Sequence, residues 1–188
     1  PEGITGDDLL QFVNAELFPA LKNLQTSTRP GDRRRVVKDV FEDAYNYMKS
    51  GQLMRQVVNK ISAVDFNNLA ERQHFGDIYE QVLTDLQSAG NAGEYYTPRA
   101  VTAFMADRID PKPGEILFDP ACGTGGFLTC AIRHMRERYV KTPAAERKMQ
   151  GALRATEKKQ LPHMLCVTNM LLHGIEDPSF VRHDNTLA

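Results

Sequence analysis

The sequence predicts an α + α/β protein, with a helical N-terminal domain over residues 1–90 and the first half of a doubly wound sheet over residues 91–188. Two observations support this division. Residues before about 90 place apolar side chains at helical spacing, whereas the later residues alternate short apolar runs with helical segments. The first apolar run leads into a glycine-rich turn and a helix, an arrangement typical of the start of a parallel sheet.

The first two helices of the N-terminal domain are predicted from their leucine and valine spacing. One lies near residues 7–24, and Pro19 is expected to bend or interrupt it. The other covers residues 32–50, because its valines, alanine and methionine recur every fourth residue. Asp32 is placed to cap its start and Ser50-Gly51 to end it.

A third helix is predicted near residues 77–88, with Gly90 just beyond its end. Its apolar spacing predicts a buried face made of Ile78, Val82, Leu83 and Leu86. The small residues of 88–94 then predict a linker or mobile loop between the two domains.

The second domain is predicted to begin with a helix over 100–108 that starts at Thr97-Pro98 and turns Val101, Phe104 and Met105 inward. The expected order after it is a strand over 115–119, a helix over 127–139, a polar stretch over 141–148, a strand over 151–156, a helix over 161–172 and a strand over 180–182. This alternation predicts a parallel sheet with crossover helices.

Composition excludes several classes of protein. With 41% hydrophobic and 25% charged residues, the 188-residue chain has the composition of an ordinary globular protein and no run long enough to cross a bilayer. Its three cysteines form no C-x-x-C pair and its five histidines show no metal-ligand spacing, which indicates no metal site and a cytoplasmic location. A net charge of −1 does not fit a basic nucleic-acid module, so if the protein acts on DNA, most contacts to the phosphates are expected to come from outside this chain.

The chain begins at Pro1 without an initiator methionine and ends at Ala188 without a closing helix. We therefore expect it to be a piece of a larger protein. Three strands with their helices use nearly all of residues 91–188, which leaves no room for a complete doubly wound sheet.

A glycine loop follows the first predicted strand. Gly123, Gly125 and Gly126 allow the backbone to approach a ligand closely, just ahead of an electropositive helix N-terminus. The dinucleotide fingerprint fails because its third glycine position holds Leu128, and no Gly-Lys-Ser/Thr of a P-loop is present. The loop by itself is weak support for a nucleotide-like ligand.

Three acids strengthen this expectation, since one follows each predicted strand. Asp119, Glu157 and Asp184 are placed at the edge of the sheet where ligands of such folds bind. An acid before the loop would repel phosphate but attract an ammonium group. S-adenosylmethionine (SAM) has the groups that such a site would bind. Its ammonium could face Asp119, its ribose hydroxyls could donate to Glu157, and its adenine amine could donate to Asp184.

The sequence resembles the M (modification methylase) subunit of type I restriction-modification systems, an N6-adenine DNA methyltransferase family. The resemblance rests on four blocks, namely Phe75-Gly-Asp-Ile-Tyr-Glu80, Gly93-Glu-Tyr-Tyr-Thr-Pro-Arg99, Asp119-Pro-Ala-Cys-Gly-Thr-Gly-Gly-Phe-Leu128, and Asn169-Met-Leu-Leu-His-Gly174 leading to Asp184-Asn-Thr-Leu187. It implies that residues 91–188 form part of a Rossmann-like, SAM-dependent methyltransferase domain.

By this resemblance, a cofactor-binding segment precedes the first strand and the glycine loop holds the methionine moiety. The residues carried over as cofactor-binding are Glu94, Tyr95, Tyr96, Thr97, Pro98, Arg99, Asp119, Gly123, Thr124, Gly125, Gly126, Glu157 and Asp184. The match at Glu157 departs from the expected pattern, because Ala155-Thr156 precedes it where the family has Gly-x.

The resemblance also implies partners and one missing motif. The expected partners are a specificity (S) subunit, a restriction (R) subunit, a second M subunit, and DNA through the assembled complex. Family members carry an Asn-Pro-Pro-aromatic motif that holds a flipped-out adenine, and this sequence has none. No catalytic residue is therefore assigned, and the 188 residues alone are expected not to turn over.

Three alternatives remain open from the sequence. One is a SAM-dependent methyltransferase with a target other than DNA. Another is a non-catalytic assembly domain whose helices bind a partner and whose glycine loop is structural. The third is a nicotinamide-dependent oxidoreductase, which Leu128 disfavours.

Overall fold

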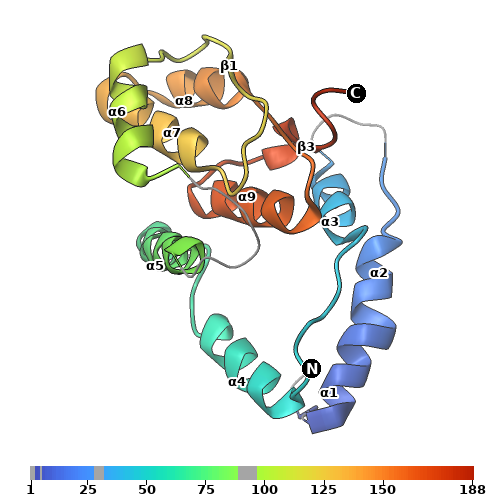
Figure 1. Cartoon of the computed structure of the whole chain (residues 1–188). Helices are drawn as coiled ribbons and strands as arrows, with labels where there is room; N and C mark the ends of the chain where they lie inside the picture. Colours follow the sequence, from blue (N-terminus) through green and yellow to red (C-terminus); the bar gives the residue numbers. More distant parts are fainter. Residues whose placement is uncertain (1–2, 5, 28–31, 89–96) are drawn as a thin grey trace. The chain divides into compact units, whose positions relative to one another are not determined.

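The computed structural model describes residues 3–4, 6–27, 32–88 and 97–188 (Figure 1). The chain divides into two compact units, residues 1–75 and 76–188. The predicted domain division between residues 90 and 91 stays a prediction, since residues 89–96 lie outside the described part. The predicted linker over 88–94 also lies outside it, except for residue 88.

The first unit begins with helix α1 (Gly6–Phe12), a π-helical turn (Val13–Leu17) and helix α2 (Phe18–Lys22). The prediction that Pro19 disturbs this helix is confirmed. Proline has no N–H to donate to the carbonyl four residues back and its ring crowds that carbonyl. The turn just before it widens, and the N–H of Phe18 donates to the carbonyl of Val13.

The predicted helix over residues 32–50 is wrong in its second half. Helix α3 (Arg33–Phe41) is capped by Asp32, whose side chain accepts from the N–H of Arg34, but it ends nine residues before Ser50. Ser50 instead caps the start of a helix that was not predicted, α4 (Gly51–Ser62), by accepting from the N–H of Leu53. The apolar periodicity of 32–50 continues through residues that are not helical.

Helix α5 (Leu69–Ser88) is longer than predicted and continues from the first unit into the second. Leu83 is buried as expected, whereas Ile78 and Val82 are each 48% exposed, so the predicted apolar face is wrong at these two positions. The side chain of Leu86 and the residue Gly90 lie outside the described part. The face of α5 that packs on the rest of the second unit instead contains Gly76 and Tyr79, which contact Leu172 and Leu165.

The second unit contains a parallel sheet of three strands in the order β1-β2-β3. These are β1 (Leu117–Asp119), β2 (Leu153–Glu157) and β3 (Val181–His183). Asp119 pairs with Ala155, and Glu157 pairs with His183. The prediction of a small parallel sheet is confirmed, with strands shifted by one or two residues.

The helices of the second unit connect and cover these strands (Figure 1). They are α6 (Arg99–Ile109), α7 (Gly126–Arg138), α8 (Pro143–Gln150), α9 (Gln160–Leu172) and a short 3₁₀ turn, η2 (Pro178–Phe180). Helix α9 packs on β2 and β3, and α6 packs on α7. The stretch over 141–148 was predicted as a polar connection, but Thr142 caps α8 within it.

The predicted inward face of α6 is wrong. Val101, Phe104 and Met105 are 44%, 63% and 40% exposed, while Thr102 and Ala106 are the buried positions. The side chain of Thr102 lies 3.2 Å from the Cys130 sulfur of α7, so small residues form this helix contact. Small side chains let two helices approach closely, which apolar spacing alone does not reveal.

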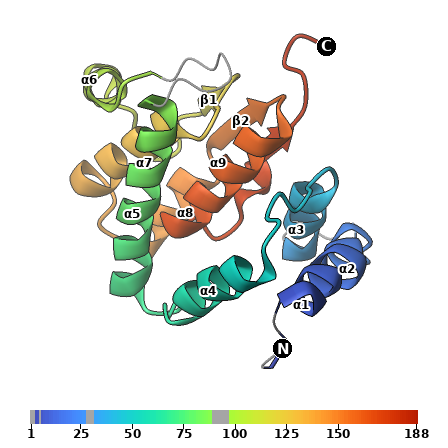
Figure 2. The same ribbon diagram turned by 60° about the horizontal axis from the view of Figure 1, so that its bottom comes forward.

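The core of the second unit lies among α7, α9 and the sheet. Its most deeply buried apolar side chains include Leu128, Ile132, Met135, Met149, Leu153, Ala155, Cys166, Met170 and Ile175. The part of α5 from Gly76 onward lies next to α9 (Figure 2): a Cβ on Gly76 would be 3.6 Å from the Cβ of Leu172, and the hydroxyl of Tyr79 donates to the carbonyl of Leu165 at 3.1 Å. Across the described ranges, none of the helices has the length and apolar character to cross a membrane.

Candidate cofactor site

The three predicted acids lie at the carboxyl ends of the three strands. Asp119 ends β1, Glu157 ends β2, and Asp184 follows β3 directly. The N–H of Asp184 donates to the carbonyl of Glu157 at 3.1 Å, which extends the β2–β3 pairing to this edge. The structure therefore brings these positions to one edge of the sheet, where ligands of open α/β sheets bind.

The glycine loop between β1 and α7 is held by the end of β2. Gly123 and Gly125 have φ of +56° and +87°, a left-handed conformation that other residues adopt only with strain. The N–H of Gly123 donates to Glu157 Oε2 at 2.9 Å, and the N–H of Gly125 donates to the carbonyl of Cys122 at 2.8 Å. Because Glu157 Oε1 also accepts from the N–H of Lys159 at 2.7 Å, this buried carboxylate orders two loops at once.

Asp119 is half-buried and only partly satisfied. Its Oδ1 accepts from the N–H of Ala121 at 3.2 Å, while its buried Oδ2 has no hydrogen-bond partner within the described residues. Burial raises the pKa of the Asp119 carboxyl, the hydrogen bond from Ala121 opposes the rise, and the negative charge of Glu157 adds to it. An unsatisfied buried carboxylate oxygen is a position that a cationic group would stabilise.

The floor of the loop is closely packed. A Cβ on Gly125 would lie 2.9 Å from the Cys166 sulfur and 3.1 Å from the Met170 Cε of α9. The sulfur of Cys122 lies 3.7 Å from that of Cys166, and both cysteines are buried free thiols. Glycine is therefore required at position 125 for two reasons, its backbone conformation and the lack of room for a side chain.

Only part of the predicted segment before α6 lies in the described structure. Thr97 and Pro98 are exposed, and Pro98 is the N-cap of α6. Arg99 extends to the loop: its Nη1 donates to the Thr129 hydroxyl at 3.2 Å, and a Cβ on Gly126 would be 2.5 Å from the same nitrogen. The other predicted residues of this segment, Glu94, Tyr95 and Tyr96, lie outside the described residues.

Asp184 is the acid whose side chain points elsewhere. It is exposed, its Oδ2 lies 2.5 Å from Nη2 of Arg182, and its Oδ1 accepts from the N–H of Asn185. The backbone of Asp184 is thus part of the edge, while its carboxylate is engaged with its own neighbours. To accept a hydrogen bond from an adenine amine, this carboxylate would have to give up its ion pair with Arg182.

Asn169 and Glu80 lie near the loop and were given no cofactor role by the sequence. Asn169 of α9 is fully buried, and its Nδ2 donates to the carbonyl of Thr124 at 3.0 Å. The same nitrogen donates to Glu80 Oε1 at 2.5 Å, and Glu80 also forms an ion pair with Arg99. Both residues lie in sequence blocks that pointed to the family, which was the available signal.

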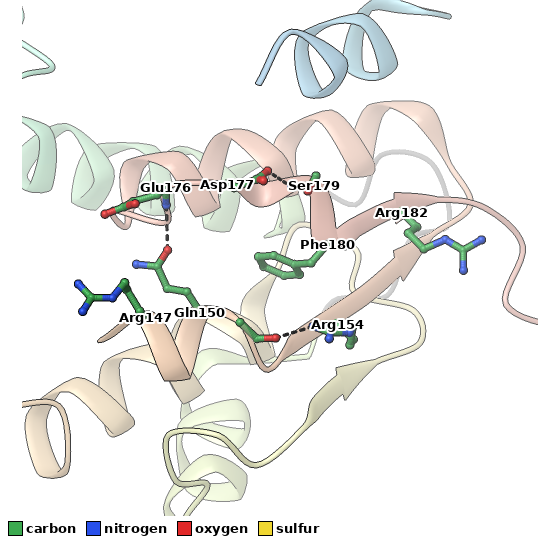
Figure 3. A pocket seen from close by; sticks show the side chains of 9 residues that line it. Arg147, Gln150, Arg154, Glu176, Asp177, Ser179, Phe180 and Arg182 are labelled. Carbon is green, nitrogen blue, oxygen red and sulfur yellow. Dashed lines mark hydrogen bonds between the residues drawn. The ribbon is translucent and has the colours of Figure 1, made fainter. Parts of the chain in front are cut away.

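A cavity of about 450 Å³ lies away from these residues, beside the amino ends of β2 and β3 (Figure 3). Its lining is mixed in charge and comprises Arg147, Gln150, Gly151, Arg154, Glu176, Asp177, Ser179, Phe180 and Arg182. Within it, the Gln150 side chain accepts from the N–H of Glu176, and Arg154 donates to the carbonyl of Gly151. None of the predicted cofactor residues lines this cavity.

A second cavity of about 180 Å³ borders Asp119 itself. Apart from Asp119 its lining is apolar and comes from α6, β1, α7 and the residues beside them, including Met105, Leu117 and Phe127. In the described part of the chain, no group of three or more acids, histidines and cysteines is arranged to hold a metal ion.

The glycine loop and the strand-end acids define the ligand site of an open parallel α/β sheet. Sequence comparison gives the particular family. The profile described as N-6 DNA Methylase matches residues 70–188, which include every element of the sheet and loop. The chain belongs to this N-6 DNA methylase family.

Several curated relatives are type I restriction enzyme methylase subunits. The EcoEI methylase subunit of Escherichia coli is 63% identical over 99% of this chain and 38% of its own length. The StySPI methylase subunit of Salmonella potsdam is 28% identical over 94% of this chain and 35% of its own length. The chain therefore spans well under half the length of these relatives.

Solved structures with similar folds are also type I proteins. A modification subunit of a putative type I restriction enzyme from Vibrio vulnificus YJ016 has a TM-score of 0.78 and 41% identity, over 98% of this chain and 40% of that one. A chain from a study of complex assembly and conformational transition in the type I R-M system has a TM-score of 0.85 and 33% identity, over 96% of this chain and 37% of that one.

Proposed function

We propose that this chain is the cofactor-binding part of a type I restriction-modification methylase subunit that transfers a methyl group from SAM to N6 of adenine in DNA. Family membership supports the methylase activity. The single observation that supports the cofactor assignment is the buried Asp119 Oδ2 without a partner, beside a glycine loop that opens α7. An ammonium group satisfies such an oxygen, and the N-terminus of a helix suits a carboxylate.

In this proposal each residue at the end of a strand binds a different part of the cofactor. Asp119 binds the ammonium group, Thr124 and the glycine loop bind the carboxylate, and Glu157 accepts from the ribose hydroxyls. Glu157 retains that capacity because each carboxylate oxygen has a second acceptor position beyond the backbone N–H it already binds. Asp184 accepts from the adenine amine once released from Arg182.

The segment that precedes α6 completes the proposed site. Glu94, Tyr95, Tyr96, Thr97, Pro98 and Arg99 are assigned to it by family resemblance. Of these, Arg99 has geometric support, because its guanidinium lies against the position of Gly126. When bound, SAM supplies an electrophilic methyl group on its sulfonium.

We assign no residue of this chain to the target adenine. The sequence has no Asn-Pro-Pro-aromatic motif, and N6 is a weak nucleophile that needs hydrogen bonds to localise its lone pair. These 188 residues are accordingly expected to bind cofactor without turnover. DNA is reached through a complex with an S subunit, an R subunit and a second M subunit, consistent with a net charge of −1. The odd number of cysteines suits a cytoplasmic location.

The test is calorimetric titration of SAM and S-adenosylhomocysteine into the methylase subunit that carries this chain. We expect binding of both ligands, a loss of affinity in Asp119→Ala, and unchanged affinity in Glu137→Gln, which removes an exposed carboxylate on α7. Absence of SAM binding by the wild-type protein would overturn the proposal. SAM binding combined with methyl transfer to a substrate other than DNA by the complete complex would favour the non-DNA methyltransferase.

A further inference from the structure

Two sequence blocks that the cofactor assignment leaves without a role meet in the structure. Glu80 closes the block Phe75–Glu80 on α5, and Asn169 opens the block Asn169–Gly174 on α9. Asn169 Nδ2 donates to Glu80 Oε1 at 2.5 Å. The two blocks are 89 residues apart in sequence, so the fold, and not local structure, creates this contact.

The amide of Asn169 also holds the glycine loop. Its Nδ2 donates at 3.0 Å to the carbonyl of Thr124, the residue between the two left-handed glycines. Both partners of this nitrogen are acceptors, so the orientation of the amide is dictated by its surroundings. The hydrogen bond from the fully buried Asn169 to Thr124 is itself buried, so water does not compete for it.

The peptide that joins Thr124 to Gly125 is therefore fixed at both of its polar groups. Its carbonyl accepts from Asn169, and its N–H donates to the carbonyl of Cys122 at 2.8 Å. This peptide lies directly before the N-terminus of α7, which begins at Gly126. Its orientation decides which backbone groups of the loop face a ligand.

Glu80 reaches the loop by a second route. It forms an ion pair with Arg99, whose Nη1 donates to the Thr129 hydroxyl at 3.2 Å and lies against Gly126. Tyr79, the neighbour of Glu80, donates to the carbonyl of Leu165 and fixes α5 on α9. One carboxylate on α5 thus contacts Asn169 and Arg99, two of the side chains that touch the loop.

We propose that Glu80 and Asn169 are positioning residues that set the orientation of the Thr124–Gly125 peptide and so couple the position of α5 to cofactor affinity. The cofactor half of this inference rests on the proposed function. Neither residue needs to touch the ligand. A shift of α5 that breaks the Glu80–Asn169 hydrogen bond frees the loop and weakens binding, so whatever separates Glu80 from Asn169 acts on the cofactor site.

The test uses the methylase subunit that carries this chain and two measurements on each variant. Hydrogen exchange of the loop amides, residues 122–126, is followed without ligand, and SAM affinity is measured by calorimetry. In Asn169→Ala and Glu80→Ala we expect faster loop exchange and affinity lower by about tenfold, the equivalent of roughly one hydrogen bond. Glu80→Gln keeps an acceptor for Asn169 and should recover part of the loss.

Two control variants on α5 separate positioning from general destabilisation. Asp77→Asn removes an exposed carboxylate of the same helix and should leave both measurements unchanged. Leu83→Ala removes a side chain that is 2% exposed, so it should lower the free energy of unfolding and leave SAM affinity at the wild-type value. The double variant Glu80→Ala/Asn169→Ala should lose less affinity than the two single losses combined, because the two residues share one hydrogen bond that either substitution already removes.

Unchanged loop exchange in Asn169→Ala and Glu80→Ala would overturn the positioning role, whatever the affinity. Equal affinity losses in Leu83→Ala and Glu80→Ala would reduce the effect to stability and also overturn it. Faster loop exchange in a protein whose wild type does not bind SAM would leave the positioning role standing while overturning the proposed function and the coupling to cofactor affinity.

Discussion

The carboxylate of Glu157 accepts the backbone N–H of Gly123 at 2.9 Å, so the end of β2 holds the loop that follows β1. This acid was expected from the sequence only as a ligand for ribose. In the structure it first orders the protein, since its other oxygen accepts from the N–H of Lys159. A residue with both roles links the shape of the loop to occupancy of the site.

Replacement of Glu157 by alanine should weaken SAM and S-adenosylhomocysteine equally. Neither the ribose contact nor the loop N–H senses the transferred methyl group, so both ligands lose the same interactions. Calorimetry with each ligand measures the two losses. A large loss for one ligand alone would contradict the assignment. Glu157→Gln keeps one oxygen acceptor, so its affinity for both ligands should lie between those of Glu157→Ala and the wild type.

Replacement of Asp119 by asparagine should raise stability and lower cofactor affinity. Burial raises the pKa of Asp119, so the folded state holds its proton to higher pH than the unfolded state does. The ionised carboxylate therefore reduces the free energy of unfolding once the pH exceeds the unfolded pKa of about 3.9, and remains a cost at neutral pH. Asp119→Asn removes that cost.

The loss of affinity in Asp119→Asn should approach that of Asp119→Ala, about 1.5–3 kcal/mol or roughly 10- to 150-fold, because the charge-assisted contact is gone in both. Urea unfolding at pH 7 without ligand and calorimetry with SAM measure the two effects. A less stable variant with wild-type affinity would contradict both the burial argument and the proposed ammonium contact.

Glycine is required more strictly at position 125 than at position 123. Both have positive φ, so alanine at either costs about 1–2 kcal/mol in backbone strain. A Cβ at Gly123 meets nothing within 4 Å, whereas one at Gly125 collides with Cys166 and Met170. Gly125→Ala should therefore lower the free energy of unfolding by about 2–5 kcal/mol, and Gly123→Ala by the strain alone. Equal losses in denaturant titrations would contradict the steric argument.

The sequence predicted the sheet and its loop better than the helical half. Short apolar runs that alternate with helical segments predict a parallel sheet, and β1, β2 and β3 lie within two residues of their predicted positions. Helical periodicity is less decisive. Residues 32–50 keep an apolar spacing of four past Phe41, where α3 ends.

Capping residues caused the largest error. Ser50 was interpreted as part of a helix stop, yet serine serves as an N-cap when its side chain accepts from a following N–H, as it does from Leu53. The geometry of the candidate site could be predicted where residues close in sequence form it, as at Asp119 and Gly125, although their cofactor roles stay predictions. The contacts of Glu80 with Asn169 and Arg99 depend on packing between distant helices, which no local pattern encodes.

Asp110 should make stability depend on pH in the acid range. It has φ of +51° and accepts from the Tyr139 hydroxyl at 2.5 Å and from His134 Nε2 at 2.7 Å, which ties the end of α6 to α7. The hydrogen bond from Tyr139, followed by that from His134, lowers the pKa of Asp110 against the effect of burial. Its contribution is therefore present above the unfolded pKa of about 3.9 and lost as the pH falls through the lower folded value.

Asp110→Asn isolates this charge, because asparagine also tolerates a positive φ. We expect the variant to be less stable than wild type at pH 7, and the difference in unfolding free energy to shrink below about pH 4, where the wild-type carboxylate begins to take up its proton. Urea unfolding in steps from pH 7 to pH 3 measures this difference. A difference that is constant over the whole range would show that the variant acts through something other than the charge of Asp110.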